Sequence, residues 1–162
     1  LYRFFDVENI IRIGSAGAIS DQLELRDIVA GISAHTNSNF ASQYHLPGSF
    51  APTADFTLLS TATEAAKELG HPLKVGSLLS SDTFYDDDEN ALHQWAKMGT
   101  LAVEMEAAGL YLNAARLGKR ALALVTISDK PFTGEATTPE ERQTTFTQMM
   151  EIALQTAVKM HG

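Results

Sequence analysis

The stretch from Thr100 to Leu110, TLAVEMEAAGL, constrains the fold of this chain more than any other. It begins as a short apolar run and, directly after two glutamates, continues with small and apolar residues at helical spacing. This pattern predicts a buried strand that turns into a helix without an intervening loop. In an open α/β sheet, ligands bind at the carboxyl ends of such strands. Glu104 and Glu106 are therefore candidate ligand-binding residues, but carboxylates are equally typical of a helix N-terminus, where the helix dipole favours negative charge.

Strand and helix patterns alternate along the rest of the chain, which favours an α/β fold around one mainly buried sheet. In addition to the strand of the opening stretch, strands are expected over residues 9–13, 25–33, 74–79 and 120–127. Helices are expected over residues 54–69, around 92–98, from the two glutamates to 117, and from 139 to 159. No repeat or composition shift marks a boundary, so residues 1–162 are expected to form a single domain.

Local signals predict how several of these elements begin and end. Thr53 is expected to cap the helix that follows it. Thr138, Pro139 and Glu141 match a capping box with proline at the first helical position. The small residues of 14–17, GSAG, directly follow the first strand. They resemble part of a phosphate-binding loop but match no complete motif, and we interpret them as a tight turn.

The composition argues against several classes of function. The formal net charge is −8 and no run of lysine or arginine occurs, so we expect no nucleic-acid partner. The sequence has no cysteine, which rules out disulfide and thiolate chemistry. No apolar run is long enough to cross a bilayer and no signal peptide is found, so we expect a soluble cytoplasmic protein with no membrane partner.

Three strand ends carry pairs of polar residues that could converge at one edge of the sheet. The pairs are Arg12 with Ser15, Glu104 with Glu106, and Ser128 with Asp129. An arginine beside a turn of backbone N–H groups suits an oxyanion such as phosphate. Two carboxylates suit a diol, and a carboxyl group desolvated at the end of an apolar strand can hold a proton for donation. Anion, diol and acid together describe the phosphorolysis of a ribonucleoside.

Each of these residues also has a purely structural interpretation. Arg12 could be an ordinary surface cation, and the two glutamates could simply favour a helix start. Asp129 could begin a turn before Pro131, or form a structural ion pair with Arg142. The acidic run 86–89 is interpreted as the start of a helix rather than as a metal site. The residues by themselves indicate an α/β enzyme whose substrate stays open.

Five motifs follow one another along the chain. They are IRIGSAG (11–17), SDTFY (81–85), VEMEAAG (103–109), TISD (126–129) and ERQTTF (141–146). In this order they resemble the bacterial, hexameric type of purine nucleoside phosphorylase, and the resemblance covers essentially the whole chain. It implies a purine/uridine phosphorylase-like three-layer α/β fold with a central mixed β-sheet flanked by helices. It further implies a homohexamer that takes phosphate as co-substrate and needs no cofactor or metal.

The resemblance also implies roles for individual residues. Phosphate binding would fall to Arg12, Ile13, Gly14 and Ser15. Nucleoside binding would fall to Phe84, Val103, Glu104, Met105, Glu106, Ser128 and Asp129. Within that set, Glu106 would hold the ribose 2′- and 3′-hydroxyls, and Asp129 would be the general acid at purine N7. Arg142 would promote this proton transfer, and because a nearby arginine favours the charged carboxylate, we expect it to approach Asp129 only when the site closes.

The implied activity is phosphorolytic cleavage of the N-glycosidic bond of purine (deoxy)ribonucleosides to free base and (deoxy)ribose 1-phosphate, the reaction of a pentosyltransferase in purine salvage. The alternatives are a related nucleosidase that uses water, and a catalytically incomplete nucleoside-binding fragment. The family has an N-terminal portion that completes the phosphate site, and no part of this chain matches it. We therefore expect an incomplete phosphate site and an exposed sheet edge. Lys130, which follows Asp129 where the family commonly has histidine, leaves the choice between 6-amino and 6-oxo purines open.

Overall fold

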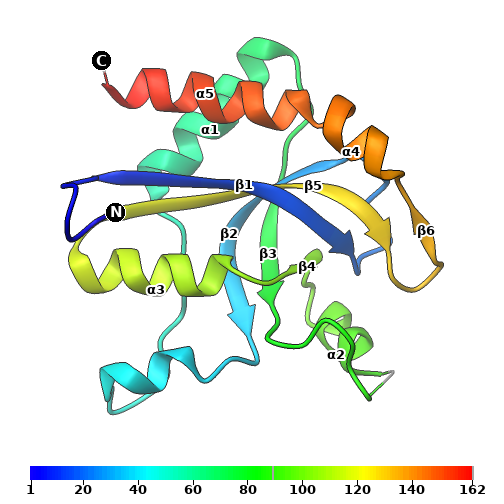
Figure 1. Ribbon diagram of the computed structural model, residues 1–162, viewed down its shortest axis with the longest axis horizontal. Coiled ribbons are helices and arrows are strands. Elements are labelled where there is room, and N and C mark those ends of the chain that lie inside the picture. Colours follow the sequence, from blue (N-terminus) through cyan, green and yellow to red (C-terminus); the bar gives the residue numbers. More distant parts are fainter. Residues whose placement is uncertain (89, 162) are drawn as a thin grey trace.

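The computed structural model describes residues 1–88 and 90–161, without the side chains of residues 143–145. Six strands form one sheet (Figure 1). They are β1 (Asn9–Ala18), β2 (Ile28–Thr36), β3 (Lys74–Ser80), β4 (Ala102–Glu104), β5 (Arg120–Lys130) and β6 (Glu135–Ala136). The helices are the short 3₁₀ helix η1 (Phe40–Tyr44), α1 (Phe56–Leu69), α2 (Ala91–Lys97), α3 (Ala107–Leu117), α4 (Pro139–Thr145) and α5 (Thr147–His161).

The sheet is mixed and closes on itself. Its order is β1-β4-β3-β2-β5-β6, and β1 pairs with β5 as well as with β4. The pairs β1–β5, β2–β3 and β3–β4 are parallel, whereas β1–β4, β2–β5 and β5–β6 are antiparallel. Closure brings strands that are far apart in sequence to one place, because β1 contacts the carboxyl end of β5 on one side and β4 on the other.

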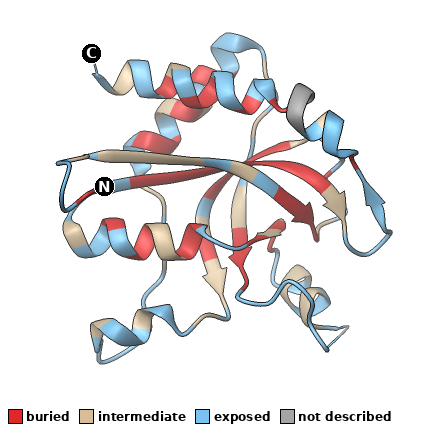
Figure 2. Cartoon of the chain, in the orientation of Figure 1, coloured by how far each residue is buried: buried red, intermediate tan, exposed pale blue. Residues whose placement is uncertain are grey.

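Helices cover both sides of the sheet, so the expected three-layer arrangement is confirmed. Figure 1 shows α1 and α5 on one side and α3 on the other. One buried cluster contains residues of α1 and α5, among them Leu58 and Ile152, and the other contains residues of α3, among them Tyr111. Buried residues accordingly gather where the helices face the strands (Figure 2).

Several expected boundaries are wrong. The segment 14–17 is not a tight turn, since β1 runs straight through it with a register shift between Ala16 and Gly17. The second strand begins at Ile28, not at residue 25. The cap of α1 is Asp55, whose carboxylate accepts a 2.9 Å hydrogen bond from the Leu58 amide, rather than Thr53. The C-terminal helix is divided into α4 and α5 at the buried Phe146.

One edge of β1 stays open over most of its length. Between Asn9 and Ala16, β1 is paired with β5 alone among the described residues, because its pairing with β4 begins at Gly17. Beside the start of β1 lies a groove of about 710 Å³ with a mainly apolar lining that includes Ile13 and Leu154. This open edge agrees with the expectation that the chain leaves a sheet edge exposed.

Tyr111 joins α3 to the sheet by two buried hydrogen bonds. Its hydroxyl donates to the Gly31 carbonyl in β2 and accepts from the Ala123 amide in β5 at 2.9 Å. Burial is the main cause that raises the pKa of Tyr111 far above its ordinary value. The side chain therefore stays protonated, and can donate, throughout the range in which proteins are stable.

Tyr111→Phe is expected to destabilise the fold by about 1–3 kcal/mol, because it leaves a buried carbonyl and a buried amide without their partner. Urea denaturation would measure the loss. Tyr85→Phe, at an exposed tyrosine, is the matched control and should change stability by less than about 0.5 kcal/mol. Equal stabilities of the two variants would contradict this role of Tyr111.

Candidate functional site

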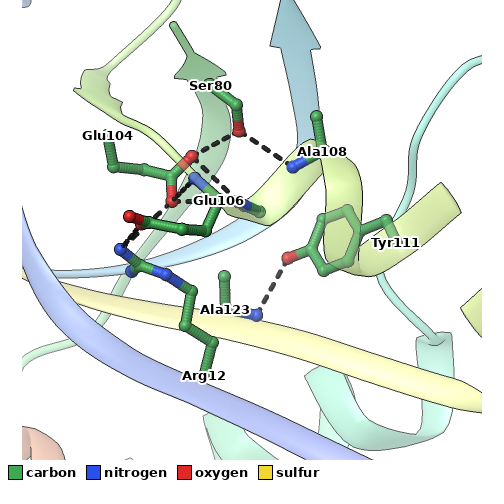
Figure 3. Close-up of polar contacts among 8 residues, drawn as sticks. Arg12, Ser80, Glu104, Glu106, Ala108, Tyr111 and Ala123 are labelled. Atoms are coloured by element: carbon green, nitrogen blue, oxygen red, sulfur yellow. Dashed lines mark hydrogen bonds and ion pairs between the residues drawn. The ribbon is translucent and has the colours of Figure 1, made fainter. Parts of the chain in front are cut away.

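The carboxyl half of β1 lies next to the strand-to-helix transition between β4 and α3. Arg12 extends from β1 toward both glutamates of that transition (Figure 3). One of its guanidinium nitrogens, Nη2, forms an ion pair with the Glu106 carboxylate and lies 3.4 Å from Oε2 of Glu104. The structure thus brings together Arg12, from the first predicted pair, and both glutamates of the second pair.

The two glutamates occupy different environments. Glu104 is buried and accepts hydrogen bonds from the backbone amides of Glu106, at 3.0 Å, and Ala107, at 3.0 and 3.1 Å. It also accepts a hydrogen bond from the Ser80 hydroxyl, which in turn accepts one from the Ala108 amide at 2.8 Å. Glu104 therefore satisfies the first amides of α3, as the helix-start interpretation of this residue predicts, although the residue at the N-cap position is Glu106. The Glu106 side chain is 60% exposed, so it is accessible to a ligand although it is paired with Arg12.

Arg12 is incompletely satisfied. Its Nη1 nitrogen is buried and has no hydrogen-bond partner among the described residues, and it lies against Gly14, where a Cβ atom would come within 2.8 Å of it. A buried donor without a partner is costly. An acceptor that entered beside Gly14 would therefore gain a donor that is already desolvated and positioned.

Ser15 does not share a face with Arg12. Side chains alternate along a strand, so Ser15 lies on the same side of β1 as Ile13, which lines the groove beside α5. Arg12 and Gly14 lie on the opposite side, toward α3. The four residues predicted to bind phosphate therefore surround the open edge of β1 instead of forming one concave loop.

Asp129 lies at the end of β5, opposite Gly17 of β1. Its Oδ1 accepts a 2.6 Å hydrogen bond from the buried Ser128 hydroxyl. A Cβ atom at Gly17 would lie 3.0 Å from Oδ2 of Asp129 and equally close to Pro131. Gly17 also pairs with Val103 on β4, so a single glycine separates the candidate acid from a predicted wall of the base pocket.

Arg142 contacts Thr137 instead of Asp129. Its Nε donates to the Thr137 hydroxyl and its Nη2 to the Thr137 carbonyl, both at 3.2 Å. Thr137 is itself anchored to the Ser128 carbonyl by its amide, at 2.7 Å, and its hydroxyl, at 2.9 Å. A structural ion pair between Asp129 and Arg142 is therefore wrong for this state, and the arginine is held one hydrogen-bonded residue away from the acid.

Two predicted nucleoside-binding residues lie at the surface. The Phe84 side chain is 75% exposed in the segment between β3 and α2, and its ring meets that of Tyr85 edge to face at 4.9 Å. Met105, between the two glutamates, is 43% exposed. Within the described part of the chain, no hydrogen bond or ring contact joins Phe84 to the other candidate residues.

Two residues that organise the site were not predicted from the sequence. Ser80 supports Glu104, and Thr137 links Arg142 to Ser128. Ser80 directly precedes the SDTFY motif and Thr137 precedes the capping box, but neither position has a local pattern that indicates such a contact. Among residues 1–88 and 90–161, no three His, Asp or Glu side chains are grouped closely enough to hold a metal ion.

The chain matches the sequence model of the phosphorylase superfamily over residues 2–160. It belongs to this superfamily, and its closed mixed sheet is the sheet of the superfamily fold. Within the superfamily it belongs to the DeoD-type purine nucleoside phosphorylases. The relatives of that name from Clostridium perfringens (strain SM101) and Clostridium beijerinckii are each 49% identical to it, over 160 and 162 residues. The relative from Geobacillus kaustophilus is 46% identical over 159 residues.

These relatives are longer than the chain. The matches cover 99%, 100% and 98% of the chain but 68%, 68% and 67% of the relatives. A solved structure of the Plasmodium knowlesi homologue of P. falciparum PNP superposes with a TM-score of 0.80 at 26% identity, over 95% of this chain and 62% of that one. The chain thus spans about two thirds of the length of the proteins it resembles.

None of its described helices has the length and apolarity needed to cross a bilayer.

Glu104→Gln is expected to cost about 1–3 kcal/mol of stability, because the amide nitrogen would face backbone N–H groups that need an acceptor. Glu106→Gln removes only a partly exposed ion pair and should cost less than about 1 kcal/mol. Chemical denaturation of both variants, beside the parent protein, tests this. The division of roles would be wrong if the two substitutions were equally destabilising.

Proposed function

We propose that this chain carries the nucleoside-binding and proton-donating part of a purine nucleoside phosphorylase. The reaction cleaves the N-glycosidic bond of a purine ribo- or deoxyribonucleoside with phosphate and gives the free base and (deoxy)ribose 1-phosphate. The observation that carries the proposal is the arrangement around β1. Arg12 of β1 has a buried donor with no acceptor among the described residues, and it pairs with the exposed carboxylate of Glu106. The half-buried Asp129 lies opposite Gly17 of the same strand.

Phosphate would bind at the open edge of β1, which can be approached from both faces. Arg12 would donate from one face with its Nη1 nitrogen, for which the described part of the chain supplies no acceptor. The Ser15 hydroxyl would donate from the other, and the backbone of Ile13 and Gly14 lies along the edge between them. Oxyanions suit such a combination of a guanidinium fork and backbone N–H groups. No cofactor is needed, because phosphate is itself the nucleophile.

The ribose would be held by Glu106, whose carboxylate can accept hydrogen bonds from two neighbouring hydroxyls. Met105 would pack beneath the sugar, and Glu104 would keep its place at the start of α3. Because Glu106 is paired with Arg12, binding of substrates would involve an exchange of partners. Phosphate would take the guanidinium and release the carboxylate for the ribose.

Asp129 would be the general acid. The C–N bond breaks with positive charge developing on the ribose and negative charge on the departing purine. Transfer of a proton from Asp129 to N7 neutralises the leaving group, while Ser128 holds the other carboxylate oxygen. A positioned acid of this kind contributes a factor of about 100–10,000 in rate. The base itself would lie between Val103 and Phe84, which requires the exposed Phe84 segment to fold over it.

Arg142 would join Asp129 only after the substrate is bound. In the structure Arg142 is bonded to Thr137 and not to Asp129. We further propose that the complete protein is a homohexamer that acts in cytoplasmic purine salvage, as the resemblance implies.

Phosphate dependence is the experiment that tests the function. Inosine and adenosine should be cleaved only when phosphate is present, and Asp129→Asn should lower the rate about 100- to 10,000-fold with no loss of folding. Arg142→Ala should lower it by a smaller factor. Cleavage that is unchanged without phosphate would instead identify a nucleosidase. Binding of inosine with no turnover would identify a nucleoside-binding remnant.

The exchange of partners at Arg12 makes a prediction of its own. Glu106→Gln should strengthen phosphate binding about two- to fivefold, because phosphate no longer competes with a carboxylate for the guanidinium. The same substitution should weaken nucleoside binding. Calorimetry with phosphate alone and with inosine alone separates the two effects, and a parallel loss of both affinities would contradict the exchange.

A further inference from the structure

The short helix α2 is attached to the rest of the molecule through stacked rings. His93 stacks on Phe132, in the turn between β5 and β6, with ring centroids 3.9 Å apart and planes inclined by 10°. Trp95 stacks on His35 of β2 at 5.8 Å. None of the residues of α2 is fully buried, although Leu92, Trp95 and Ala96 are half-buried, and the side chain of Asn90, which precedes the helix, makes no capping hydrogen bond. The two ring stacks therefore join α2 to β2 and to the turn between β5 and β6.

The His93–Phe132 stack joins two segments that carry residues of the candidate site. Phe132 follows Asp129 by three positions, in a hairpin whose strands pair Asp129 with Ala136. His93 belongs to the helix that directly follows the exposed segment containing Phe84. The stack therefore connects the segment of Asp129 to the segment of Phe84. Among the described residues, no backbone pairing joins these two segments.

The base of the β5–β6 hairpin is held by contacts that do not involve the His93–Phe132 stack, whereas its tip contacts α2 through this stack. Pro131 packs on Gly17, and Thr137 is bonded to the Ser128 carbonyl. The tip turns at Gly134, which has a φ of 77°, and closes with hydrogen bonds to the Lys130 carbonyl. Removing the ring at position 132 would therefore free the tip and α2 from each other without disturbing the position of Asp129 in β5.

We propose that His93 and Phe132 are positioning residues that hold α2, and with it the Phe84 segment, against the β5–β6 hairpin on the purine side of the site. Neither residue contacts the reacting atoms. This assignment rests on the proposed function, because it assumes that a purine lies between Phe84 and Asp129. Its consequence is that the stack contributes to nucleoside binding and not to phosphate binding, which takes place at the open edge of β1.

The test combines hydrogen exchange with binding and kinetics in the full chain. His93→Ala and Phe132→Ala should each speed the exchange of amides in residues 90–97 and raise both the Kd and the KM for inosine. The expected change is about two- to tenfold, the range that one aromatic pair supplies. The KM for phosphate should not change. His93→Phe keeps a stacking ring and should stay close to the parent, and Phe4→Ala, at an exposed phenylalanine elsewhere, is the matched control.

The double variant decides whether the two rings act as one unit. If they do, removing both should weaken inosine binding no more than removing either. Additive losses, or a His93→Phe variant as weak as His93→Ala, would overturn the assignment. Faster exchange with an unchanged inosine Kd would show a purely structural stack and would also overturn it. A parent chain that binds no purine nucleoside at all would overturn the proposed function, and this assignment with it.

Discussion

The pairing of β1 with two strands at Gly17 is the constraint on which the rest of the site depends. On one side Gly17 is opposite Asp129 of β5, and on the other it is opposite Val103 of β4. A Cβ atom here would lie 3.0 Å from the Asp129 carboxylate and from the Pro131 ring, so both would have to shift by a few tenths of an ångström to admit a side chain. Because Gly17 has no side chain, β5 and β4 can both approach β1 here, and this sets the spacing between Asp129 and the transition from β4 to α3.

The second constraint is the burial of Glu104. A buried carboxylate is stable only where hydrogen bonds replace its lost hydration. Here those bonds come from the first amides of α3 and from Ser80, and the nearby Arg12 guanidinium balances the charge. Because Glu104 fixes where α3 begins, it also fixes the exposed position of Glu106 two residues later. Glu104 is thus buried at the helix start, whereas Glu106 is exposed to solvent.

Sequence reasoning succeeded where the determining contacts are local. The capping box of Thr138 and Glu141 is present because its two hydrogen bonds link residues three positions apart. It failed for 14–17, where small residues suggested a turn but in fact make room for a guanidinium and for a strand from the other end of the chain. The stack of His93 on Phe132 depends on tertiary packing, which no spacing rule indicates. The contact between Arg142 and Thr137 joins residues only five positions apart at the start of α4, and it was missed because Arg142 was expected to face Asp129.

The position of Arg142 bears on the role proposed for Asp129. As the proposed general acid, Asp129 would need a proton before the bond breaks, which an adjacent guanidinium would oppose, and afterwards its carboxylate would be stabilised by the same guanidinium. Arg142 makes two hydrogen bonds to Thr137, from its Nε and Nη2 nitrogens. In the proposed mechanism a bidentate ion pair with the newly formed carboxylate would replace both of these bonds, and loss of the proton from Asp129 would favour this change of partners.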